Sequence, residues 1–166
     1  SDTRRALLEA ATTLFAAHGF DGVSLRAITD QAGANIAAVN YHFGSKDGLI
    51  ADVLDALIAP LNQERLARLD AVADEDDLEA ILRAFVEPVF GALTDPDRAR
   101  VCLALAARVH LDPERGHALM VEQFAPVVER FHAALTTALP TLPPATLFWR
   151  LHLVVGSALH VLQARN

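Results

Sequence analysis

The sequence predicts an all-α protein, and three observations support this fold class. Apolar residues make up 52% of the 166 residues, and they recur at the three-to-four spacing of a helix face. The filler residues are alanine, leucine and valine, and alanine, leucine, arginine and glutamate are all good helix formers. No run of alternating β-branched residues indicates a strand. We therefore expect helices packed around a core of substantial size.

Four helices are expected in the first part of the chain, at residues 3–18, 25–32, 36–43 and 46–69. The second and third are short, and Gly33 between them supplies the positive φ that a sharp turn needs. Ser24 and Asn35 are suited to cap these two helices, and Ser45 is suited to cap the fourth. The fourth helix carries a broad apolar stripe and connects the two parts of the chain.

Four further helices are expected after an acidic break at residues 74–77, and they span residues 78–93, 97–110, 113–139 and 144–165. Pro126 is expected to kink or break the third of them. The last is apolar on almost every side, so it must be covered on more than one side. A further helix is expected to follow residue 166.

Residues 24–46 carry most of the functional information. Two short helices joined by a glycine turn are how a helix-turn-helix lays its second helix in the DNA major groove. Small side chains at Ala37 and Ala38 would let that helix approach the bases, and their methyl groups can touch thymine methyls. Asn35 or Asn40 can hydrogen-bond an adenine edge.

Phosphate contacts are expected at the ends of these helices. Tyr41 and His42 suit this role, with packing against the first helix as the alternative for both. Ser24 and Lys46 lie at helix N-termini, where free N–H groups hold a phosphate, although Lys46 could also be an ordinary solvated lysine. The predicted DNA-binding residues are Ser24, Arg26, Asn35, Ile36, Ala37, Ala38, Asn40, Tyr41, His42 and Lys46.

The net charge of −7 argues against a nucleic-acid binder, but the charge is unevenly distributed. Residues 1–50 hold four bases against five acids, whereas residues 51–166 hold ten arginines against sixteen acids. The acidity therefore lies mostly away from the proposed DNA face. Few cations predict modest non-specific affinity, so tight binding should require two copies to engage DNA together.

Several short motifs between residues 5 and 54 support the same interpretation. They are Leu8-x-Ala-Ala11, Leu14-Phe15-x-x-x-Gly19-Phe20, Ser24-Leu25-Arg26-x-Ile28, Ala32-Gly33, Tyr41-His42-Phe43 and Ser45-Lys46-x-x-Leu49. In these motifs the chain resembles the N-terminal domain of the TetR family of bacterial transcriptional regulators. Asn40 departs from the family pattern, because many members have a tyrosine there.

The resemblance implies a helix-turn-helix DNA-binding domain at residues 1–48 and a helical ligand-binding and dimerisation domain at residues 49–166. It implies a homodimeric, cytoplasmic regulator of transcription, most often a repressor that a small molecule releases from a double-stranded DNA operator. Residues 147–162 are the expected dimer interface, because Gly156, Ser157 and Ala158 allow close helix approach.

An enzyme is the least supported alternative. The sequence has no glycine-rich phosphate loop and no nucleophile elbow. The Glu114/His117 and Glu129/His132 pairs have the spacing of di-iron ligands, but such a bundle needs two further inward glutamates that we cannot identify. We predict no catalytic residue, no cofactor and no metal site.

A helical protein that binds a small molecule without a DNA role is the other alternative. The effector is expected to be small and largely apolar, with Arg108 and His152 orienting its polar end; ordinary core packing with a snorkelling arginine is the competing interpretation. The candidate lining residues are Phe85, Val89, Leu105, Arg108, Val109, Met120, Phe124, Val128, Phe148 and His152.

The remaining features fit a protein of the reducing cytoplasm. Cys102 is the single cysteine, so no intrachain disulfide can form, and its apolar neighbours favour a small buried side chain over a redox sensor. No signal peptide is expected, and no apolar run reaches the ~18–20 residues that span a bilayer. We therefore expect no membrane association.

Overall fold

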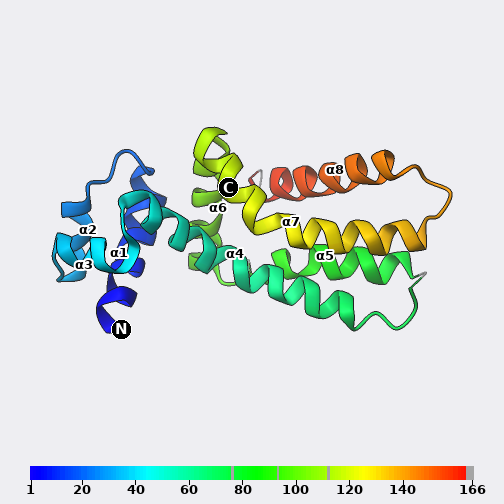
Figure 1. Cartoon of the computed structure of the whole chain (residues 1–166), viewed down its shortest axis with the longest axis horizontal. Coiled ribbons are helices and arrows are strands. Elements are labelled where there is room, and N and C mark those ends of the chain that lie inside the picture. Colours follow the sequence, from blue (N-terminus) through cyan, green and yellow to red (C-terminus); the bar gives the residue numbers. More distant parts are fainter. Residues whose placement is uncertain (76, 93, 112, 164–166) are drawn as a thin grey trace. The chain divides into compact units, whose positions relative to one another are not determined.

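Figure 1 shows the computed structural model, which describes residues 1–75, 77–92, 94–111 and 113–163, without the side chains of residues 110–122, 155 and 158–163. Every element in these ranges is a helix, as the sequence predicts. The helices are α1 (Asp2–His18), α2 (Leu25–Ala32), α3 (Ile36–Phe43), α4 (Lys46–Asp70), α5 (Leu78–Ala92), α6 (Pro96–Leu111), α7 (Pro113–Ala138) and α8 (Pro144–Gln163).

The helix limits follow local signals in the sequence. α2 and α3 begin and end as predicted, α1, α4 and α7 each differ from the prediction by one residue at one end, and α6 extends one residue beyond the prediction at both ends. The predicted ends at residues 93 and 165 lie outside the described residues. Pro126 neither breaks nor ends α7, which continues through it.

The contacts divide the chain into two compact units, Ser1–Ala59 with Pro96–Met120 (unit 1) and Pro60–Asp95 with Val121–Asn166 (unit 2). α4 and α7 pass from one unit to the other. This division differs from the predicted boundary between residues 48 and 49, because α6 packs against α1. Leu105 and Val109 of α6 share a buried cluster with Leu7 and Phe15 of α1. The predicted functional boundary stays a prediction.

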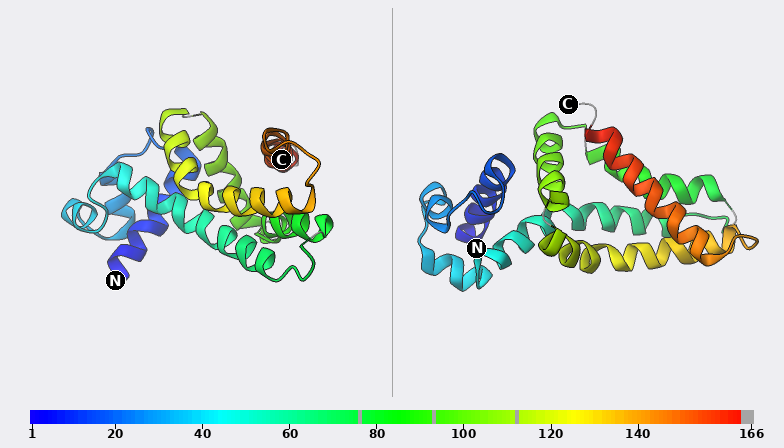
Figure 2. Two further views of the ribbon diagram at one scale, coloured as in Figure 1. Left: turned by 45° about the vertical axis from the view of Figure 1, so that its right-hand side comes forward. Right: turned by 90° about the horizontal axis from the view of Figure 1, so that it is seen from above.

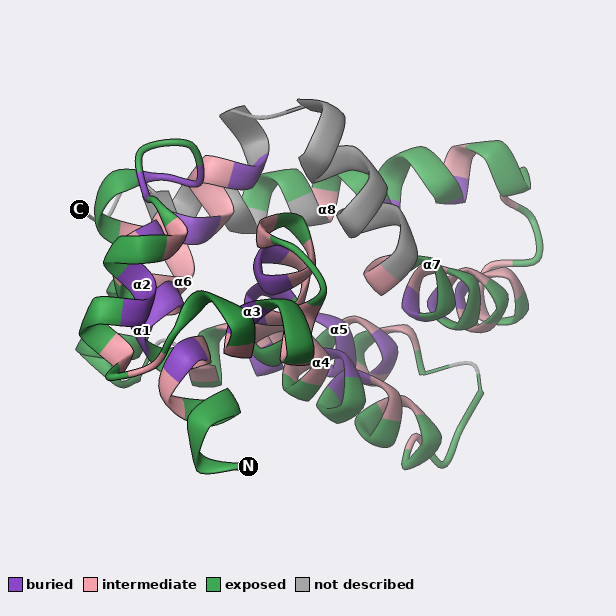
Figure 3. Ribbon diagram, turned by 60° about the vertical axis from the view of Figure 1, so that its left-hand side comes forward, coloured by how far each residue is buried: buried purple, intermediate pink, exposed green. Residues whose placement is uncertain are grey.

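The core of unit 1 lies among α1, α2, α3, the first part of α4 and α6. Leu7, Ile28, Val39 and Leu49 contribute one fully buried side chain from each of the first four helices. Buried residues form the inner faces of α1 and α2 in Figure 3. Val39 is the buried residue of α3 in this cluster. Its packing therefore determines which side of α3 faces away from the core.

The core of unit 2 lies among α5, the second part of α7 and α8 (Figures 1 and 2). Phe85 and Phe131 meet edge to face, with ring centroids 4.9 Å apart. Leu147 and Leu151 of α8 are buried in this cluster. The opposite side of α8 is open, since Trp149 is 65% and Leu153 is 68% exposed. Among the described side chains of α8, those of Trp149 and Leu153 are thus left open, although the sequence predicts that the helix is covered on more than one side.

Candidate nucleic-acid interface

The turn between α2 and α3 is built by local hydrogen bonds. Gly33 has a φ of 63°, a left-handed conformation that favours glycine. The backbone N–H of Ala34 donates to the carbonyl of Thr29 over 2.9 Å and closes the end of α2. The Asn35 side chain then starts α3 by accepting from the N–H of Ala38 over 2.9 Å. The two helices are thus joined through a short, hydrogen-bonded connection.

The outer face of α3 is open to a partner. Ile36, Ala37, Asn40 and Tyr41 are all exposed, and at 3.6 residues per turn they share one side of the helix, opposite the buried Val39. Ile36 is 47% and Tyr41 84% exposed, which is unusual for large apolar and aromatic side chains. The structure thus assembles four of the predicted DNA-binding residues into one surface, the α3 reading face.

Two of the predicted residues lie elsewhere on α3. Ala38 and His42 lie one turn apart on the same side of α3. Both are half-buried because this side is next to the core-facing Val39. Ala38 packs against the core of unit 1. The Nε2 atom of His42 lies 3.4 Å from the Oγ of Ser1, beside the start of α1. His42 therefore has the helix 1 contact that the sequence left as an alternative, whereas the exposed Tyr41 does not pack there.

Asn35 and Asn40 differ in what they can offer to a base. Recognition of adenine by asparagine uses both the oxygen and the nitrogen of the amide. The Oδ1 atom of Asn35 already accepts from the Ala38 N–H as a helix cap. Asn40 is exposed on the α3 reading face. Asn40 is therefore the better placed of the two to contact a base edge.

Two of the predicted phosphate contacts, Ser24 and Lys46, lie at helix N-termini. Ser24 is exposed and caps α2, with its Oγ accepting from the Ala27 N–H over 3.1 Å. Lys46 is the first residue of α4. Among the described residues neither Arg26 nor Lys46 forms an ion pair, whereas Arg4 pairs with Asp52 at 2.6 Å and Arg5 pairs with Asp2 at 3.2 Å. Two of the four N-terminal cations thus remain available for phosphate groups.

The candidate ligand-lining residues fall in both units. In unit 1, Leu105 and Val109 are buried in the core. Arg108 is half-buried, and its guanidinium carbon lies 3.5 Å from the position of a Cβ on Gly19, at the end of α1. Arg108 therefore contacts α1. The side chain of Met120 lies outside the described ones.

In unit 2, Phe85 is part of the core, and Val89, Phe124 and Val128 are half-buried. Phe148 and His152 are exposed on α8, with ring centroids 4.1 Å apart. The Nδ1 atom of His152 lies 2.9 Å from the Phe148 carbonyl. His152 is thus paired within its own helix and does not point into a core.

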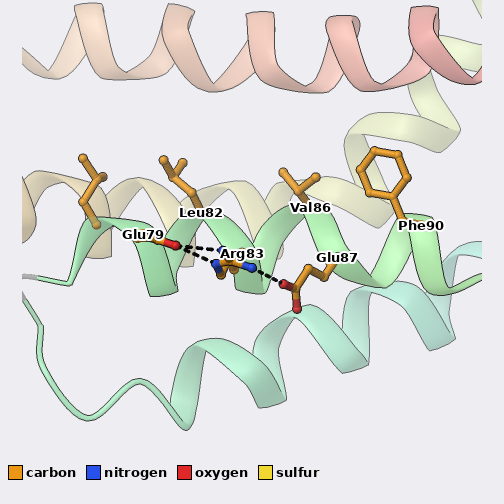
Figure 4. A pocket seen from close by; sticks show the side chains of 7 residues that line it. Glu79, Leu82, Arg83, Val86, Glu87 and Phe90 are labelled. Carbon is orange, nitrogen blue, oxygen red and sulfur yellow. Dashed lines mark hydrogen bonds and ion pairs between the residues drawn. The ribbon is translucent and has the colours of Figure 1, made fainter.

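An open groove that sequence reasoning missed runs along α5 (Figure 4). Leu82, Val86 and Phe90 point to the same side of the helix, and Arg83 lies between Glu79 and Glu87 on another side. Ion pairs of 2.8 and 3.1 Å join Arg83 to Glu79 and Glu87, respectively. The side-chain hydrogen bonds to these glutamates raise the pKa of Arg83, and the one to Glu79 contributes most. The groove is lined by Leu78, Glu79, Leu82, Arg83, Val86, Glu87 and Phe90.

Unit 2 also contains a buried arginine that sequence reasoning missed. Arg65 of α4 is only 5% exposed. Its Nε donates to the carbonyl of Phe85, and its Nη1 donates to Oδ1 of Asn62, each over 2.9 Å. Burial lowers the pKa of Arg65 to about 10. The available signal was its place on the apolar stripe of α4, four residues after Leu61 and four before Leu69.

The described side chains include no group of three or more histidine, cysteine, aspartate or glutamate residues that could hold a metal ion. His132 has a different contact, since its Nε2 lies 3.2 Å from the carbonyl of Pro144. The side chains of Glu114 and His117 lie outside the described ones. Among the described residues, no helix is both long and apolar enough to cross a bilayer.

The fold of unit 1 and the open α3 reading face define a helix-turn-helix protein. Comparison with protein families supports this class and identifies one family within it. Residues 7–53 match the model described as bacterial regulatory proteins, tetR family. Residues 83–166, just over half of the chain, match the tetracyclin repressor-like C-terminal domain. The chain belongs to the tetR family of bacterial regulatory proteins.

Curated relatives agree with this assignment. The HTH-type transcriptional dual regulator CecR of Shigella flexneri is 33% identical over 143 residues, covering 80% of this chain and 61% of CecR. The HTH-type transcriptional repressor AcnR of Corynebacterium glutamicum is 29% identical over 116 residues, covering 68% of this chain and 54% of AcnR. The chain thus spans little more than half the length of these relatives.

Solved structures show the same fold. A TetR-family transcriptional regulator from Rhodococcus sp. superposes with a TM-score of 0.72 and 18% identity, covering 100% of this chain and 90% of that one. The ketosteroid transcriptional regulator KstR2 of Mycobacterium tuberculosis superposes with a TM-score of 0.66 and 18% identity, covering 96% of this chain and 81% of that one.

Proposed function

We propose that this chain is a sequence-specific DNA-binding regulator of transcription that uses α3 as its recognition helix. The observation that carries the proposal is the division of α3 into a buried and an open side. Val39 anchors the helix in the core of unit 1, while Ile36, Ala37, Asn40 and Tyr41 form the exposed α3 reading face. A helix with small, polar and aromatic residues on its open side suits the major groove.

Phosphate contacts would hold the α3 reading face in register. Ser24 and Lys46 lie at the N-termini of α2 and α4, where unpaired N–H groups attract an anion. Arg26 is exposed, and Tyr41 can donate its hydroxyl to a phosphate oxygen. Base contacts would specify the operator, and these flanking groups would fix orientation. Relatives named as repressors, such as AcnR, favour repression over activation.

The regulator is proposed to act as a homodimer through α8. Trp149 and Leu153 are exposed one turn apart on the side of α8 opposite Leu147 and Leu151. Exposed apolar patches of this kind mark interaction sites. Two-fold symmetry would place two recognition helices one DNA turn or more apart on a near-palindromic operator. Because operator DNA lies in the bacterial cytoplasm, the proposal places the protein there.

A small, largely apolar effector is proposed to release the operator. Its binding to the helical part after residue 48 would be coupled to DNA binding through α4, which belongs to both units. Such coupling is reciprocal, so operator DNA would weaken effector binding by the same factor. Equal operator affinity with and without an effector that binds would contradict this part of the proposal.

The test of the proposal combines operator selection with two variants. An operator is selected from random duplex DNA, and its retention is measured at low salt with the full chain. Retention should be lost in the double variant Tyr41→Ala with Lys46→Ala. Arg100→Ala is the control, because it also removes an exposed cation of unit 1 but lies on α6. Unchanged retention in the double variant would reject DNA reading and favour a ligand-binding protein without a DNA role.

A further inference from the structure

The buried Arg65 carries a charge that the described residues do not neutralise. No carboxylate among the described side chains lies within ion-pair distance of it, and its hydrogen bonds go to a backbone carbonyl and an amide oxygen. The lowered pKa of about 10 still leaves Arg65 protonated at neutral pH. The interior of unit 2 therefore contains a full positive charge, which is costly to bury without an anionic partner.

Neutral groups hold this guanidinium in place. Asn62 accepts from Nη1 and donates its own Nδ2 to the carbonyl of Gln123 over 2.9 Å. The guanidinium carbon lies 4.6 Å from the centre of the Phe85 ring and 5.7 Å from that of Phe124. These contacts orient the cation and attract it weakly through the ring faces. They do not cancel its charge.

The two carbonyl acceptors have the same place in their helices. Phe85 lies three residues before Pro88 in α5, and Gln123 lies three residues before Pro126 in α7. A proline inside a helix removes one N–H and disturbs the preceding turn, so side-chain donors can reach carbonyls there. The Arg65–Asn62 pair is thus anchored at both proline turns, and this fixes the direction of the guanidinium.

One edge of the guanidinium remains available. Nε and Nη1 make the two hydrogen bonds, and Nη2 makes none with the residues that the structure describes. The edge formed by Nη1 and Nη2 matches the two oxygens of a carboxylate. Apolar surface lies on the same helix as the carbonyl that accepts from Arg65, because Leu82 and Val86 of α5 pack against the Phe85 cluster and also line the groove on α5.

We propose that Arg65, oriented by Asn62, binds the carboxylate of an effector whose remaining body is apolar. The carboxylate would supply the missing negative charge, and the apolar body would lie against the side chains of α5. This inference deepens the proposed function and rests on it for the regulatory consequence, although binding itself needs no DNA. A purely structural role, in which Arg65 only ties α4 to α5 and α7, is the competing interpretation.

Matched probes separate the two interpretations in the unaltered chain. Octanoate, octan-1-ol and octanamide have the same length and differ in the charge of the head group. Their binding to the full chain without DNA is measured by isothermal titration calorimetry. Octanoate should bind at least about tenfold more tightly than either neutral probe, as expected for hydrogen bonds to a charged group. Equal affinities, or no binding of octanoate, would overturn the proposal.

Two variants on the same helix test the residue. Arg65→Met keeps the length and apolar stem and should abolish the preference for octanoate. Arg68→Met is the matched control, because Arg68 is exposed and pairs with Glu64 and Glu87, so the preference should persist. A preference retained in folded Arg65→Met would overturn the assignment. If Arg65→Met does not fold, the comparison of charged and neutral probes in the unaltered chain still decides.

Operator retention, measured in parallel, keeps this inference distinct from the proposed function. Octanoate should weaken operator binding by the unaltered chain but not by Arg65→Met. A chain that prefers octanoate and ignores DNA would reject only the DNA-binding function. A chain that retains its operator and shows no preference for octanoate would reject only the role of Arg65.

Discussion

Arg4 at the start of α1 and Asp52 in α4 form an ion pair of 2.6 Å, and this pair lies beside the end of α3. The Arg4 guanidinium carbon lies 5.3 Å from the centre of the Phe43 ring, at the end of α3. One arginine thus contacts both helices next to the α3 reading face. Because Asp52 pairs with Arg4, this arginine adds little to the positive charge that the proposed DNA binding would use.

We expect the Arg4–Asp52 pair to stabilise unit 1 modestly. In a double-mutant cycle of Arg4→Met and Asp52→Asn, the coupling free energy of unfolding should be about 0.2–1 kcal/mol, because both side chains are partly exposed. Screening at about 1 M salt should reduce this coupling. Urea unfolding at low and high salt provides the measurement. Equal coupling at both salt concentrations would contradict an exposed, screened pair.

Gly48 should not tolerate a side chain. A Cβ at this position would lie 2.0 Å from the backbone carbonyl oxygen of Phe43, which cannot rotate away. Gly48→Ala is therefore expected to lower the free energy of unfolding by roughly 1–3 kcal/mol, as in overpacked cores. Gly91→Ala in α5 is the control, since no atom lies within 4 Å of its Cβ position. It should be neutral or stabilising by up to about 1 kcal/mol, and equal losses in both variants would refute the steric argument.

Substitutions at Asn35 and Asn40 should distinguish an effect on stability from an effect on DNA recognition. Asn35→Ala removes the cap of α3 and should lower the free energy of unfolding by about 1 kcal/mol, whereas Asn35→Asp should retain most of it. Asn40→Ala should leave stability within about 0.5 kcal/mol, since the side chain is exposed. If Asn40 reads a base, its loss should relax operator discrimination by about 1–3 kcal/mol. Thermal unfolding and competition binding test these outcomes, and unchanged discrimination in Asn40→Ala would exclude it from base reading.

Leu153→Arg should weaken the proposed dimer. Leu153 is exposed on α8, so the substitution leaves the core of unit 2 intact but places a charge on the proposed interface. Thr137→Arg adds the same charge at another exposed helical position and serves as the control. Sedimentation velocity should show monomers for Leu153→Arg and dimers for Thr137→Arg. A dimeric Leu153→Arg with unchanged dissociation constant would place the interface elsewhere.

Cys102 should react slowly as a thiol. Burial raises its pKa, and nearby Arg98 only partly opposes this. A raised pKa means less thiolate at every pH below it, so alkylation by iodoacetamide should have its midpoint above that of a free cysteine, about 8.5. The rate profile with pH, compared with that of N-acetylcysteine, checks this. A midpoint below that of the free thiol would revive the redox-sensor interpretation.

Local signals explain why the elements around the α3 reading face were predicted closely. Ser24, Gly33 and Asn35 act within a few residues of their own positions, through hydrogen bonds that the structure shows. The sequence also identified Tyr41 as a surface residue of α3, but it left packing against the first helix open for both Tyr41 and His42. Only the burial of each side chain distinguishes them.

Contacts between residues far apart in the chain explain why the surroundings of two arginines were not predicted. The sequence left Arg108 between a ligand contact and ordinary packing and gave no sign of its contact with Gly19, which lies far away in the chain; its ligand role stays a prediction. It overlooked Arg65, because an arginine on an apolar stripe most often snorkels to water. The burial of Arg65 depends on α5 and α7, which supply the carbonyl of Phe85, the Phe124 ring and, through Asn62, the carbonyl of Gln123.

The sequence by itself determined the all-α fold, the limits of α2 and α3, and the set of residues from which the α3 reading face is drawn. These properties depend on helix periodicity and on caps, which act over one or two turns. The tertiary structure alone decided that α6 joins the core of unit 1, that Ala38 and His42 leave the α3 reading face, and that Arg65 is buried without a described counter-ion. Those outcomes depend on side chains that are far apart in the chain and exclude water together. A local sequence pattern does not specify which distant side chains meet.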